Sequence, residues 1–372
     1  MSKKKILNTY INATSIRSAC GDTQKTLAYI FNKQSAITPF TNIIPDKTIA
    51  IGKFSTSNNF YSTLFESIDE ILSTSNLSDF SKTLLLIGSS VGGMATTEKV
   101  FFEENSYTNI DISKHTIDSI ASQIDIKYKF LDTRSFSTAC TSSANALKTA
   151  KELINLGAYE NILVIGADEI CATTIYGFSA LGILSNEICS PFQNDRKGMN
   201  VAEGIGILLL QNKKQDNSIE LIGAGTSSDA YHIANPDPEA RGAITAIKNA
   251  INDANIHPND IGYINAHGTG TQANDSTEAK AILEIFSNQT PVSSSKANIG
   301  HTLGAAGAIE AILCVEALKQ QKLLPQLKSQ NIIDDINIVK ESKSCTFKYA
   351  LSNSFAFGGN NTSLIFGVCN ES

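Results

Sequence analysis

The chain has 372 residues, of which 42% are hydrophobic and 18% charged, and its net charge is −6. These values are typical of a globular protein with a substantial core and argue against general nucleic-acid binding, although a local basic patch for an acidic partner is compatible with them. Seven cysteines, an odd number without C-x-x-C spacing, indicate neither a disulfide framework nor a zinc site. No stretch approaches the roughly 18–20 apolar residues of a membrane span, so we expect a reduced, cytosolic protein.

Short apolar runs alternate with helical patterns along the chain, which favours a layered α/β fold. In chain order, the apolar runs predict buried strands at Thr83–Ile87, Asn161–Ile165, Ile205–Leu210, Ile219–Ile222, Ile261–Asn265, Cys345–Leu351 and Thr362–Gly367. Helical spacing between them predicts helices at Ala144–Leu156, Ala243–Ala254, Thr277–Phe286 and Ala305–Gln320.

The polar stretch Gln211–Ser218 is the best candidate for a boundary within the chain. It would divide the protein into residues 1–215, which carry Cys140, and residues 216–372, which carry His267 and His301. A chain of this length accommodates two ordinary domains or one large duplicated one. An ordinary hairpin loop between two strands of one domain is an equally good interpretation of the stretch. The two parts are not visibly alike in sequence.

Cys140 stands at the start of a predicted helix, among small residues. Apolar residues between Ala144 and Ile154 recur at helical spacing, so the thiol lies at or just before the helix N-terminus. Unpaired N–H groups and the helix dipole stabilise a thiolate there, which predicts a lowered thiol pKa and a nucleophile. A buried structural cysteine is the alternative. The other cysteines lack this setting, and we expect structural roles for Cys20, Cys171, Cys189, Cys314, Cys345 and Cys369.

Two of the five histidines lie in Gly-rich segments. His267 follows a predicted strand and precedes Gly268, so it should project from the strand end into a loop. His301 precedes a helix start rich in small residues, which permits close packing. A lone histidine is more often a satisfied polar group than a catalyst, but two such sites coincide here with a plausible thiolate. The remaining histidines have no such setting: His115, His232 and His257.

Metal binding is the competing use of a cysteine and two histidines. The three residues come from distant loops and no fourth ligand is evident, so we expect no metal site. The segment Gly88–Gly93 could imitate a phosphate loop, but it lacks the G-K-[ST] ending. We therefore expect no nucleotide cofactor.

Four segments together closely resemble the elongating type of β-ketoacyl-[acyl carrier protein] synthase: Ser137–Ser143, Asn265–Thr271, Lys296–Gly304 and Asn353–Asn360. The resemblance extends from about Ile6 to Phe366. It implies a thiolase-type fold, in which two similar α/β halves stack as a five-layered αβαβα structure. It also implies a decarboxylating Claisen condensation, in which acyl-Cys140 reacts with malonyl-acyl carrier protein and yields a 3-oxoacyl-acyl carrier protein for fatty acid or polyene biosynthesis. The phosphopantetheine arm would arrive on the carrier protein, and the enzyme would hold no cofactor of its own.

The resemblance also implies supporting residues around this chemistry. Lys296 and Glu310 would order the site, although for Glu310 a salt bridge without catalytic effect is the alternative. Asp275 and Glu278 are spaced like an Asp-x-x-Glu helix start, and we interpret both as supporting groups. The Phe357 N–H would join that of Cys140 in an oxyanion hole, and the Phe357 ring would gate the acyl pocket. Met199 and Ala356 depart from the family pattern beside this pocket.

The segment Asp168–Cys171, with Thr174 and Gly177-Phe178, resembles the synthases of aryl-polyene clusters, which often work with a chain-length-factor-like subunit. We therefore expect a homodimer or such a heterodimer, paired through strand edges of the Asn161–Ile165 region and its neighbours. The alternative function is that of a non-catalytic or heteromeric partner subunit in a synthase complex. Cys140 argues against the non-catalytic version, because chain-length factors lack the cysteine. A thioester hydrolase is a third possibility.

Overall fold

The computed structural model describes residues 6–44, 47–54, 59–75, 77 and 79–369. Its strands are β1 Tyr10–Ser18, β2 Gly21–Asp22, β3 Thr38–Ile44, β4 Lys47–Ile51, β5 Thr83–Gly88, β6 Asp132–Phe136, β7 Asn161–Asp168, β8 Gly204–Gln211, β9 Ile219–Ser228, β10 Ile261–Asn265, β11 Val292–Ser293, β12 Tyr349–Phe355 and β13 Asn360–Val368. Its α-helices are α1 Thr23–Phe31, α2 Phe60–Thr74, α3 Met94–Glu104, α4 Ser119–Tyr128, α5 Ser142–Asn155, α6 Ala172–Ala180, α7 Arg241–Ala254, α8 Gln272–Phe286, α9 Lys296–Ile299 and α10 Ala306–Gln320. Short 3-10 turns include η2 Ile112–Lys114, η4 Leu303–Ala305 and η6 Phe357–Gly359.

One eleven-stranded sheet contains the same strand order twice. The first half reads β6-β5-β7-β8-β1 and the second reads β11-β10-β12-β13-β9. In each half three strands run parallel and the next two pair antiparallel. A short antiparallel contact joins β1 to β9, where Tyr10 lies opposite Glu220 and Ile11 opposite Ile219. The two halves are therefore similar α/β units, and the predicted thiolase-type fold is confirmed.

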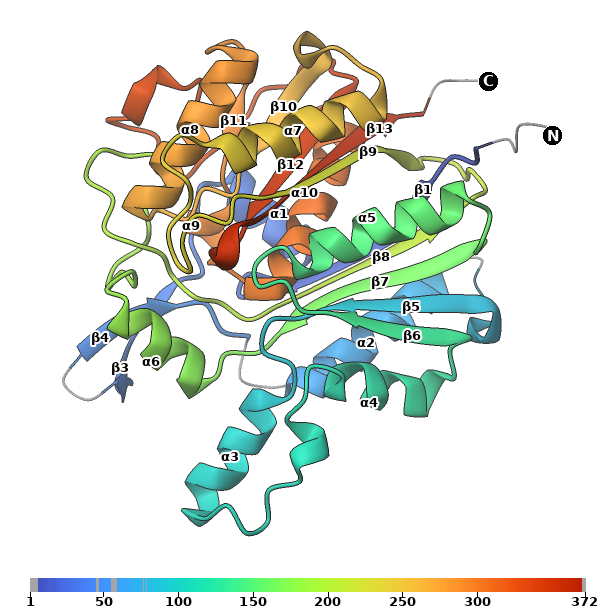
Figure 1. The fold of residues 1–372 in the computed structure, drawn as a ribbon, viewed down its shortest axis with the longest axis vertical. Helices are drawn as coiled ribbons and strands as arrows, with labels where there is room; N and C mark the ends of the chain where they lie inside the picture. The colour runs from blue at the N-terminus through green and yellow to red at the C-terminus, as the bar shows by residue number, and fades with distance from the viewer. Residues whose placement is uncertain (1–5, 45–46, 55–58, 76, 78, 370–372) are drawn as a thin grey trace.

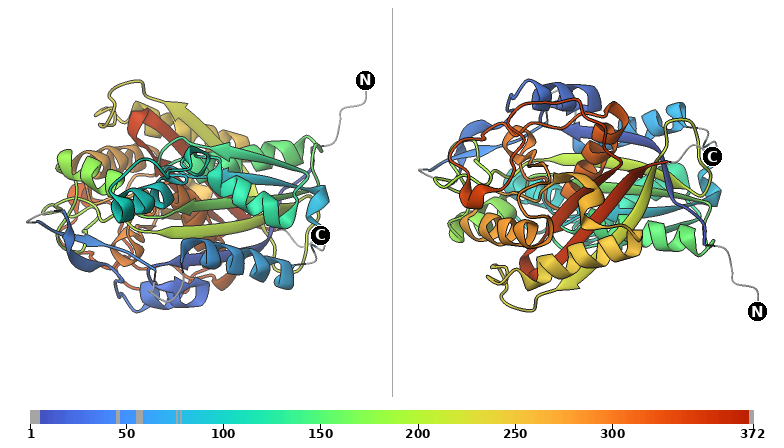
Figure 2. Two further views of the ribbon diagram at one scale, coloured as in Figure 1. Left: turned by 90° about the horizontal axis from the view of Figure 1, so that it is seen from below. Right: turned by 90° about the horizontal axis from the view of Figure 1, so that it is seen from above.

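Helices α5 and α10 lie between the two halves of the sheet, and other helices cover the outer faces (Figures 1 and 2). Alternate residues of β7 point to opposite layers, as the two-residue period of a strand requires. Ile162 and Val164 join the central core with α5 and α10, whereas Leu163 and Ile165 pack outward against α2 and α4. Helix α10 is buried on nearly all sides, as expected for a helix between two sheet layers.

Most predicted elements are present, with small shifts at their ends, but the structure differs from the sequence analysis at three points. The strand predicted at Cys345–Leu351 lies four residues further along, at Tyr349–Phe355, because polar residues of β12 are buried rather than exposed. Strand β6 was not predicted, since its DTRSF sequence is polar. Asn161–Ile165 itself is not an interface edge, because β7 pairs on both sides, with β5 and β8, whereas an interface through neighbouring strands remains a prediction.

The segment that follows β8 leads directly into β9, but these two strands are not neighbours because β1 lies between them. The segment around Gln211–Ser218 is therefore not a simple hairpin loop. The division of the chain into residues 1–215 and 216–372 remains a prediction.

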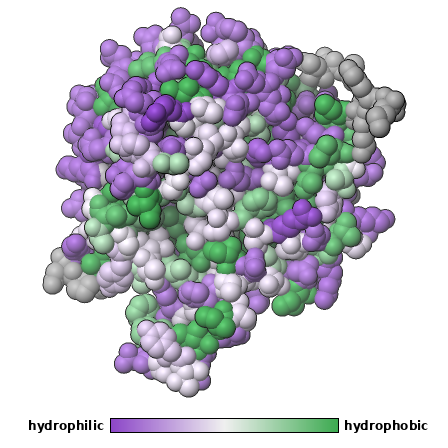
Figure 3. All heavy atoms as spheres, in the orientation of Figure 1, coloured by the Kyte–Doolittle hydropathy of each residue, from purple (hydrophilic) through white to green (hydrophobic). Residues whose placement is uncertain are grey.

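An arm formed by α3 and η2 projects from the first half (Figure 1). Apolar side chains lie exposed on it, notably Phe102, Tyr107 and Ile112, and Figure 3 shows this apolar surface on the lower projection. Two glycines close the base of the arm: a Cβ on Gly93 would lie 1.7 Å from the Lys114 carbonyl oxygen, and one on Gly92 would lie 2.6 Å from Ile117 Cα. Within the described ranges, no helix is long and apolar enough to cross a membrane.

Candidate active site

Cys140 lies at the end of the loop that connects β6 to α5, two residues before the helix begins at Ser142. The preceding residue, Ala139, has φ +52°, a left-handed conformation that costs a non-glycine residue about 1–3 kcal/mol. At this sharp turn Cys140 lines a cleft. The predicted position at a helix start is confirmed.

The predicted lowering of the Cys140 pKa is wrong for the resting protein. Burial raises the pKa of the thiol to about 12, although the Lys296 ammonium acts in the opposite direction. Loss of hydration penalises the thiolate more than the nearby cation favours it. The resting thiol is therefore neutral at physiological pH.

His267 and His301 meet Cys140 in this cleft. His267 follows β10, and His301 follows α9 after Gly300, whose φ is +84°. The Cys140 sulfur and one ring nitrogen from each histidine lie within 4.8 Å of one another. The two imidazole rings are perpendicular, with centroids 5.2 Å apart. Three residues that are distant in sequence thus face one reaction volume.

The hydrogen bonds of the two rings differ. His301 Nδ1 accepts the Leu303 N–H at 3.0 Å, so in the neutral ring the proton sits on Nε2, which is then a donor. His267 Nδ1 is buried and has no hydrogen-bond partner among the described residues. Burial lowers the pKa of both histidines well below its ordinary value, and the Lys296 charge adds to this effect. Both rings are therefore neutral at rest.

Lys296 and Glu310 form an ion pair behind the histidines, with exposed side-chain fractions of only 1% and 2%. The Lys296 ammonium also donates to the His267 carbonyl oxygen at 2.7 Å. Glu310 Oε2 has no partner among the described residues. The pair therefore connects α10 to the loop that carries His267, as expected for groups that order the site.

Glu278 anchors the same loop from α8. It accepts the backbone N–H groups of His267 at 2.9 Å and Gly268 at 2.7 Å, and the Asn353 side chain at 3.1 Å. Burial raises the pKa of Glu278 to about 7, and these donors oppose the rise. The carboxylate positions the His267 backbone and does not face the thiol.

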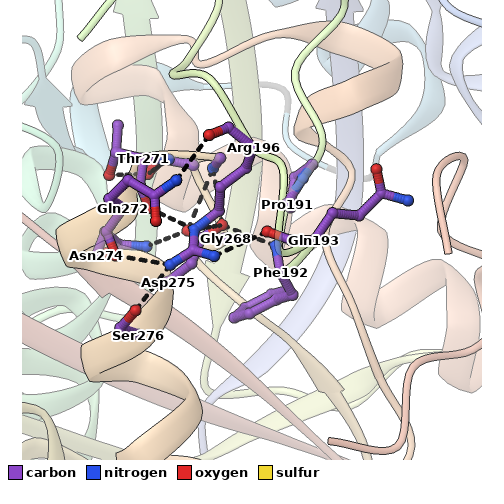
Figure 4. A network of polar contacts seen from close by, with 12 residues as sticks. Pro191, Phe192, Gln193, Arg196, Gly268, Thr271, Gln272, Asn274, Asp275 and Ser276 are labelled. Carbon is purple, nitrogen blue, oxygen red and sulfur yellow. Dashed lines mark hydrogen bonds and ion pairs between the residues drawn. The ribbon is translucent and has the colours of Figure 1, made fainter. Parts of the chain in front are cut away.

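Asp275 holds the next residues of the loop, together with a residue that sequence reasoning missed. It accepts the N–H groups of Gly270 and Phe192, and it lies 3.7 Å from the guanidinium of buried Arg196. Arg196 in turn donates to the carbonyl oxygens of Thr271, Gln193 and Gln272 and to the Ser276 hydroxyl (Figure 4). Arg196 thereby joins the loop after His267 to the segment before Met199.

The expected Asp-x-x-Glu helix start is wrong. Helix α8 begins at Gln272, five residues before the predicted start, and Thr271 occupies the N-cap position. Asp275 and Glu278 therefore lie inside the helix, where they bind loop N–H groups and not those of their own helix end. No pattern in the sequence distinguishes this use of an acidic pair from helix capping.

The cleft has a volume of ≈ 320 Å³ and is lined by Cys140, His267, His301 and Phe357. The Phe357 ring lies edge-on to Phe178 of α6, with centroids 6.0 Å apart, and Met199 lines the cleft nearby. At other points the lining is polar: Thr269, Thr271, Gln272 and Asn274. The oxyanion hole formed by the Phe357 and Cys140 N–H groups remains a prediction.

The three meeting side chains are also a possible ligand set for a metal. The sequence argument that they come from distant loops does not count against this, because the fold brings them together. Among the described residues, no fourth Cys, His, Asp or Glu joins the group. The expectation that no metal binds remains a prediction.

Comparisons with known families cover most of the chain. Residues 55–216 match the model of the β-ketoacyl synthase N-terminal domain, and residues 219–330 match that of the β-ketoacyl synthase C-terminal domain. A 3-oxoacyl-[acyl-carrier-protein] synthase homolog of Saccharomyces cerevisiae is 36% identical over 310 residues, which span 76% of this chain and 70% of that protein. The 3-oxoacyl-[acyl-carrier-protein] synthase 2 of Staphylococcus aureus is 37% identical over 247 residues, so the match spans only 61% of that relative's length.

Solved structures give matches over nearly the whole chain. A ketosynthase from Xenorhabdus doucetiae, solved in complex with its chain length factor, is 32% identical with a TM-score of 0.89, and 98% of each chain is covered. A β-ketoacyl synthase from Burkholderia phymatum shares the fold, with a TM-score of 0.87 and 24% identity, over 98% of this chain and 100% of that one.

Proposed function

The chain belongs to the β-ketoacyl synthase family, and from this premise we propose that its cleft carries out a decarboxylating Claisen condensation on carrier-bound thioesters. The observation that carries the proposal is the meeting of one thiol and two neutral imidazoles within 4.8 Å in one cleft. A thiol can hold the acyl group, and two neutral ring N–H donors can stabilise an enolate.

Acylation uses Cys140. The Cys140 sulfur attacks the carbonyl carbon of an acyl thioester, a new S–C bond forms, and the S–C bond to the carrier's phosphopantetheine breaks. The proton of the Cys140 thiol ends on the departing pantetheine thiol. The resting thiol is neutral, so acylation must include loss of this proton from the Cys140 sulfur. The polar lining by Thr269 and Thr271, whose hydroxyls lie 2.9 Å apart, can hydrogen-bond the amides of the arm.

Condensation uses the histidines. When malonyl-acyl carrier protein enters, CO₂ leaves and its bonding electrons form an enolate on the thioester. His301 Nε2–H, fixed by the Leu303 bond to Nδ1, donates to the enolate oxygen together with His267. The enolate carbon then attacks the acyl-Cys140 carbonyl, a C–C bond forms, and the S–C bond to Cys140 breaks. The Cys140 sulfur leaves as a thiolate and takes up a proton from water, which restores the thiol. The product is a 3-oxoacyl carrier protein two carbons longer.

Mass analysis of the carrier-bound product tests this function. The purified chain, given acyl and malonyl carrier proteins, should release a 3-oxoacyl product, and Cys140→Ala should abolish acyl transfer without loss of the fold. A cysteine-reactive inhibitor such as cerulenin should leave its adduct on Cys140. Free fatty acid as the main product would instead identify a hydrolase, and an adduct only on other cysteines would overturn the assignment.

We also propose that the protein works as a dimer, with a second copy or with a chain-length-factor-like subunit. Among the described residues, the outer strand β6 pairs only with β5, so its other edge is unpaired; the strand leads into the Cys140 loop, and exposed Leu131 directly precedes it. The apolar arm residues Phe102 and Tyr107 belong to the same half of the fold. A free strand edge beside apolar surface favours pairing with another chain. The Xenorhabdus doucetiae relative, solved with its chain length factor, supports the heteromeric version.

Light scattering tests the assembly. Leu131→Lys should weaken association, whereas a substitution on the far surface, Lys248→Gln, should not. A stable and active monomer at micromolar concentration would contradict both versions of the dimer. Condensation that appears only after addition of a second subunit would select the heteromeric enzyme. Polyene biosynthesis and a cytosolic location remain predictions of the sequence.

A further inference from the structure

Asp168, the last residue of β7, is a fully buried carboxylate beside the candidate site. Its Oδ1 accepts the Ser89 hydroxyl and the Val91 N–H, and its Oδ2 accepts the Gly304 N–H at 2.6 Å. The Ser90 N–H reaches both oxygens, at 3.1 and 2.9 Å. In the part of the chain that the structure describes, no cation pairs with this carboxylate. Only neutral groups donate to it, and burial of a charge without a cation is costly. The carboxylate in turn gives these buried N–H groups an acceptor.

The donors belong to two loops that must approach closely. One follows β5 and contains the Gly-rich segment Gly88–Gly93, and the other follows His301 and begins α10. A Cβ on Gly304 would lie 2.6 Å from Ser90 N and 2.8 Å from Asp168 Oδ2, so only glycine permits this approach. A Cβ on Gly88 would lie 2.3 Å from Ser143 N, beside the Cys140 helix. Within the Gly-rich segment, the N–H groups of Ser90 and Val91 are bound to Asp168. The expectation that no nucleotide binds there remains a prediction.

A short chain of bonds runs from Asp168 to the ring of His301. The carboxylate fixes the Gly304 N–H, and Gly304 is bonded to Leu303, whose φ of +53° is strained for a side-chain-bearing residue. The Leu303 N–H donates to His301 Nδ1. That bond decides which ring nitrogen carries the proton and therefore whether Nε2 faces the cleft as a donor.

We propose that Asp168 is the positioning residue of His301. By holding the strained Leu303-Gly304 turn, it keeps Nε2–H of His301 aimed at the enolate oxygen. The inference rests on the proposed condensation and adds to it a residue outside the four recognised segments. An asparagine cannot replace the carboxylate, because both oxygens accept backbone N–H groups and the amide NH₂ would face one set of them. Asp168→Asn should therefore release the turn.

The Asp168 carboxylate supports His301 but disfavours ionisation of the Cys140 thiol. Its negative charge contributes to the raised pKa of the Cys140 thiol, after burial and against Lys296. Burial raises the pKa of Asp168 to about 6, so it is largely ionised at pH 7.5. Removal of the charge should make Cys140 easier to ionise while His301 loses its orientation. A purely structural role would impair both functions together.

The experiment compares two rates in wild type, Asp168→Asn and a control, Asp253→Asn. Asp253 also accepts a backbone N–H and a charged side chain, from Ala224 and Lys151, but lies outside the cleft. At pH 7.5, decarboxylation of malonyl-acyl carrier protein should fall by about 10- to 100-fold in Asp168→Asn, since misplacing a reacting group has effects of this size. Alkylation of Cys140 by iodoacetamide should be unchanged or faster. Asp253→Asn should change neither rate.

The results distinguish failure of the proposed function, failure of the positioning role and a purely structural role of Asp168. If wild type does not condense even with a chain-length-factor-like subunit added, the proposed function fails and the role of Asp168 falls with it. If wild type condenses while Asp168→Asn decarboxylates within about threefold of it, the positioning role is refuted and the proposed function stands. If Asp168→Asn loses decarboxylation and alkylation in equal proportion, the carboxylate is only structural. Should the variant fail to fold, Ser89→Ala gives the second test, because it removes the hydroxyl donor to Asp168 Oδ1 without a clash. Decarboxylation should fall while alkylation is unchanged or faster, and equal loss of both would show a structural role.

Discussion

The buried pair of Lys296 and Glu310 permits a sharp test of whether these groups order the site or only neutralise each other. Lys296→Met removes the ammonium and leaves Glu310, whose Oε2 already lacks a partner among the described residues, in an apolar setting. Burial raises the pKa of Glu310 and Lys296 lowers it, so without the lysine the folded variant should take up a proton there.

That proton uptake sets the magnitude. The ordinary pKa of an exposed glutamate is 4.5. Protonation at pH 7.5 therefore costs about 4 kcal/mol, at 1.36 kcal/mol for each pH unit. The folded variant binds a proton that the unfolded chain does not bind above its own pKa, so the variant gains stability relative to wild type as pH falls. At pH 5.5 the loss should shrink to about 1.4 kcal/mol.

Urea denaturation at the two pH values measures this difference, and Glu310→Gln with the double variant completes a thermodynamic cycle. We expect Lys296→Met with Glu310→Gln to recover most of the stability, because no unpaired charge remains buried. Condensation should stay at least about 10-fold below wild type, because the His267 carbonyl has lost its donor. A double variant that recovers both stability and activity would refute the ordering role of Lys296. A loss that does not depend on pH would refute the protonation argument.

Three further outcomes follow from the same geometry. His301→Ala and His267→Ala should each slow malonyl decarboxylation by about 10²- to 10³-fold, as for loss of one oxyanion donor, and should slow acylation of Cys140 less. Measurement of CO₂ release and of the acyl-enzyme mass distinguishes the two steps. Loss of acylation with decarboxylation retained would contradict these roles. Because the pKa of the Cys140 thiol is about 12, its alkylation rate should rise about tenfold for each pH unit between pH 6.5 and 9.5; a plateau below pH 9 would indicate the lowered pKa expected from the helix start. Arg196→Lys should lose about 3 kcal/mol in urea denaturation, because a single ammonium cannot reproduce the planar set of bonds to Thr271, Gln193 and Gln272; a lysine variant as stable as wild type would show that the charge near Asp275 suffices.

The sequence by itself determined several of the elements and the thiol and imidazole residues of the cleft. Continuous apolar runs predicted β5, β7, β8 and β10 because strands buried on both faces need apolar residues throughout. Helical spacing after Cys140 placed the thiol at the start of α5. The glycines around His267 and His301 indicated loops at element ends. Each of these patterns involves residues that are close together in the sequence, so the sequence alone is sufficient to recognise it.

Only the tertiary structure decided what surrounds those residues. The pKa of Cys140 depends on how much water the packed halves exclude, and this loss of hydration reversed the expectation drawn from the helix end alone. Among the described residues, β6 pairs only with β5, and only the order of strands in the folded sheet shows that this polar segment is the outer strand. Asp168 and Arg196 support the site through backbone groups from other loops, and backbone N–H and carbonyl groups are the same in every sequence. The fold decides which backbone groups a buried side chain contacts, because such contacts join segments far apart in the chain.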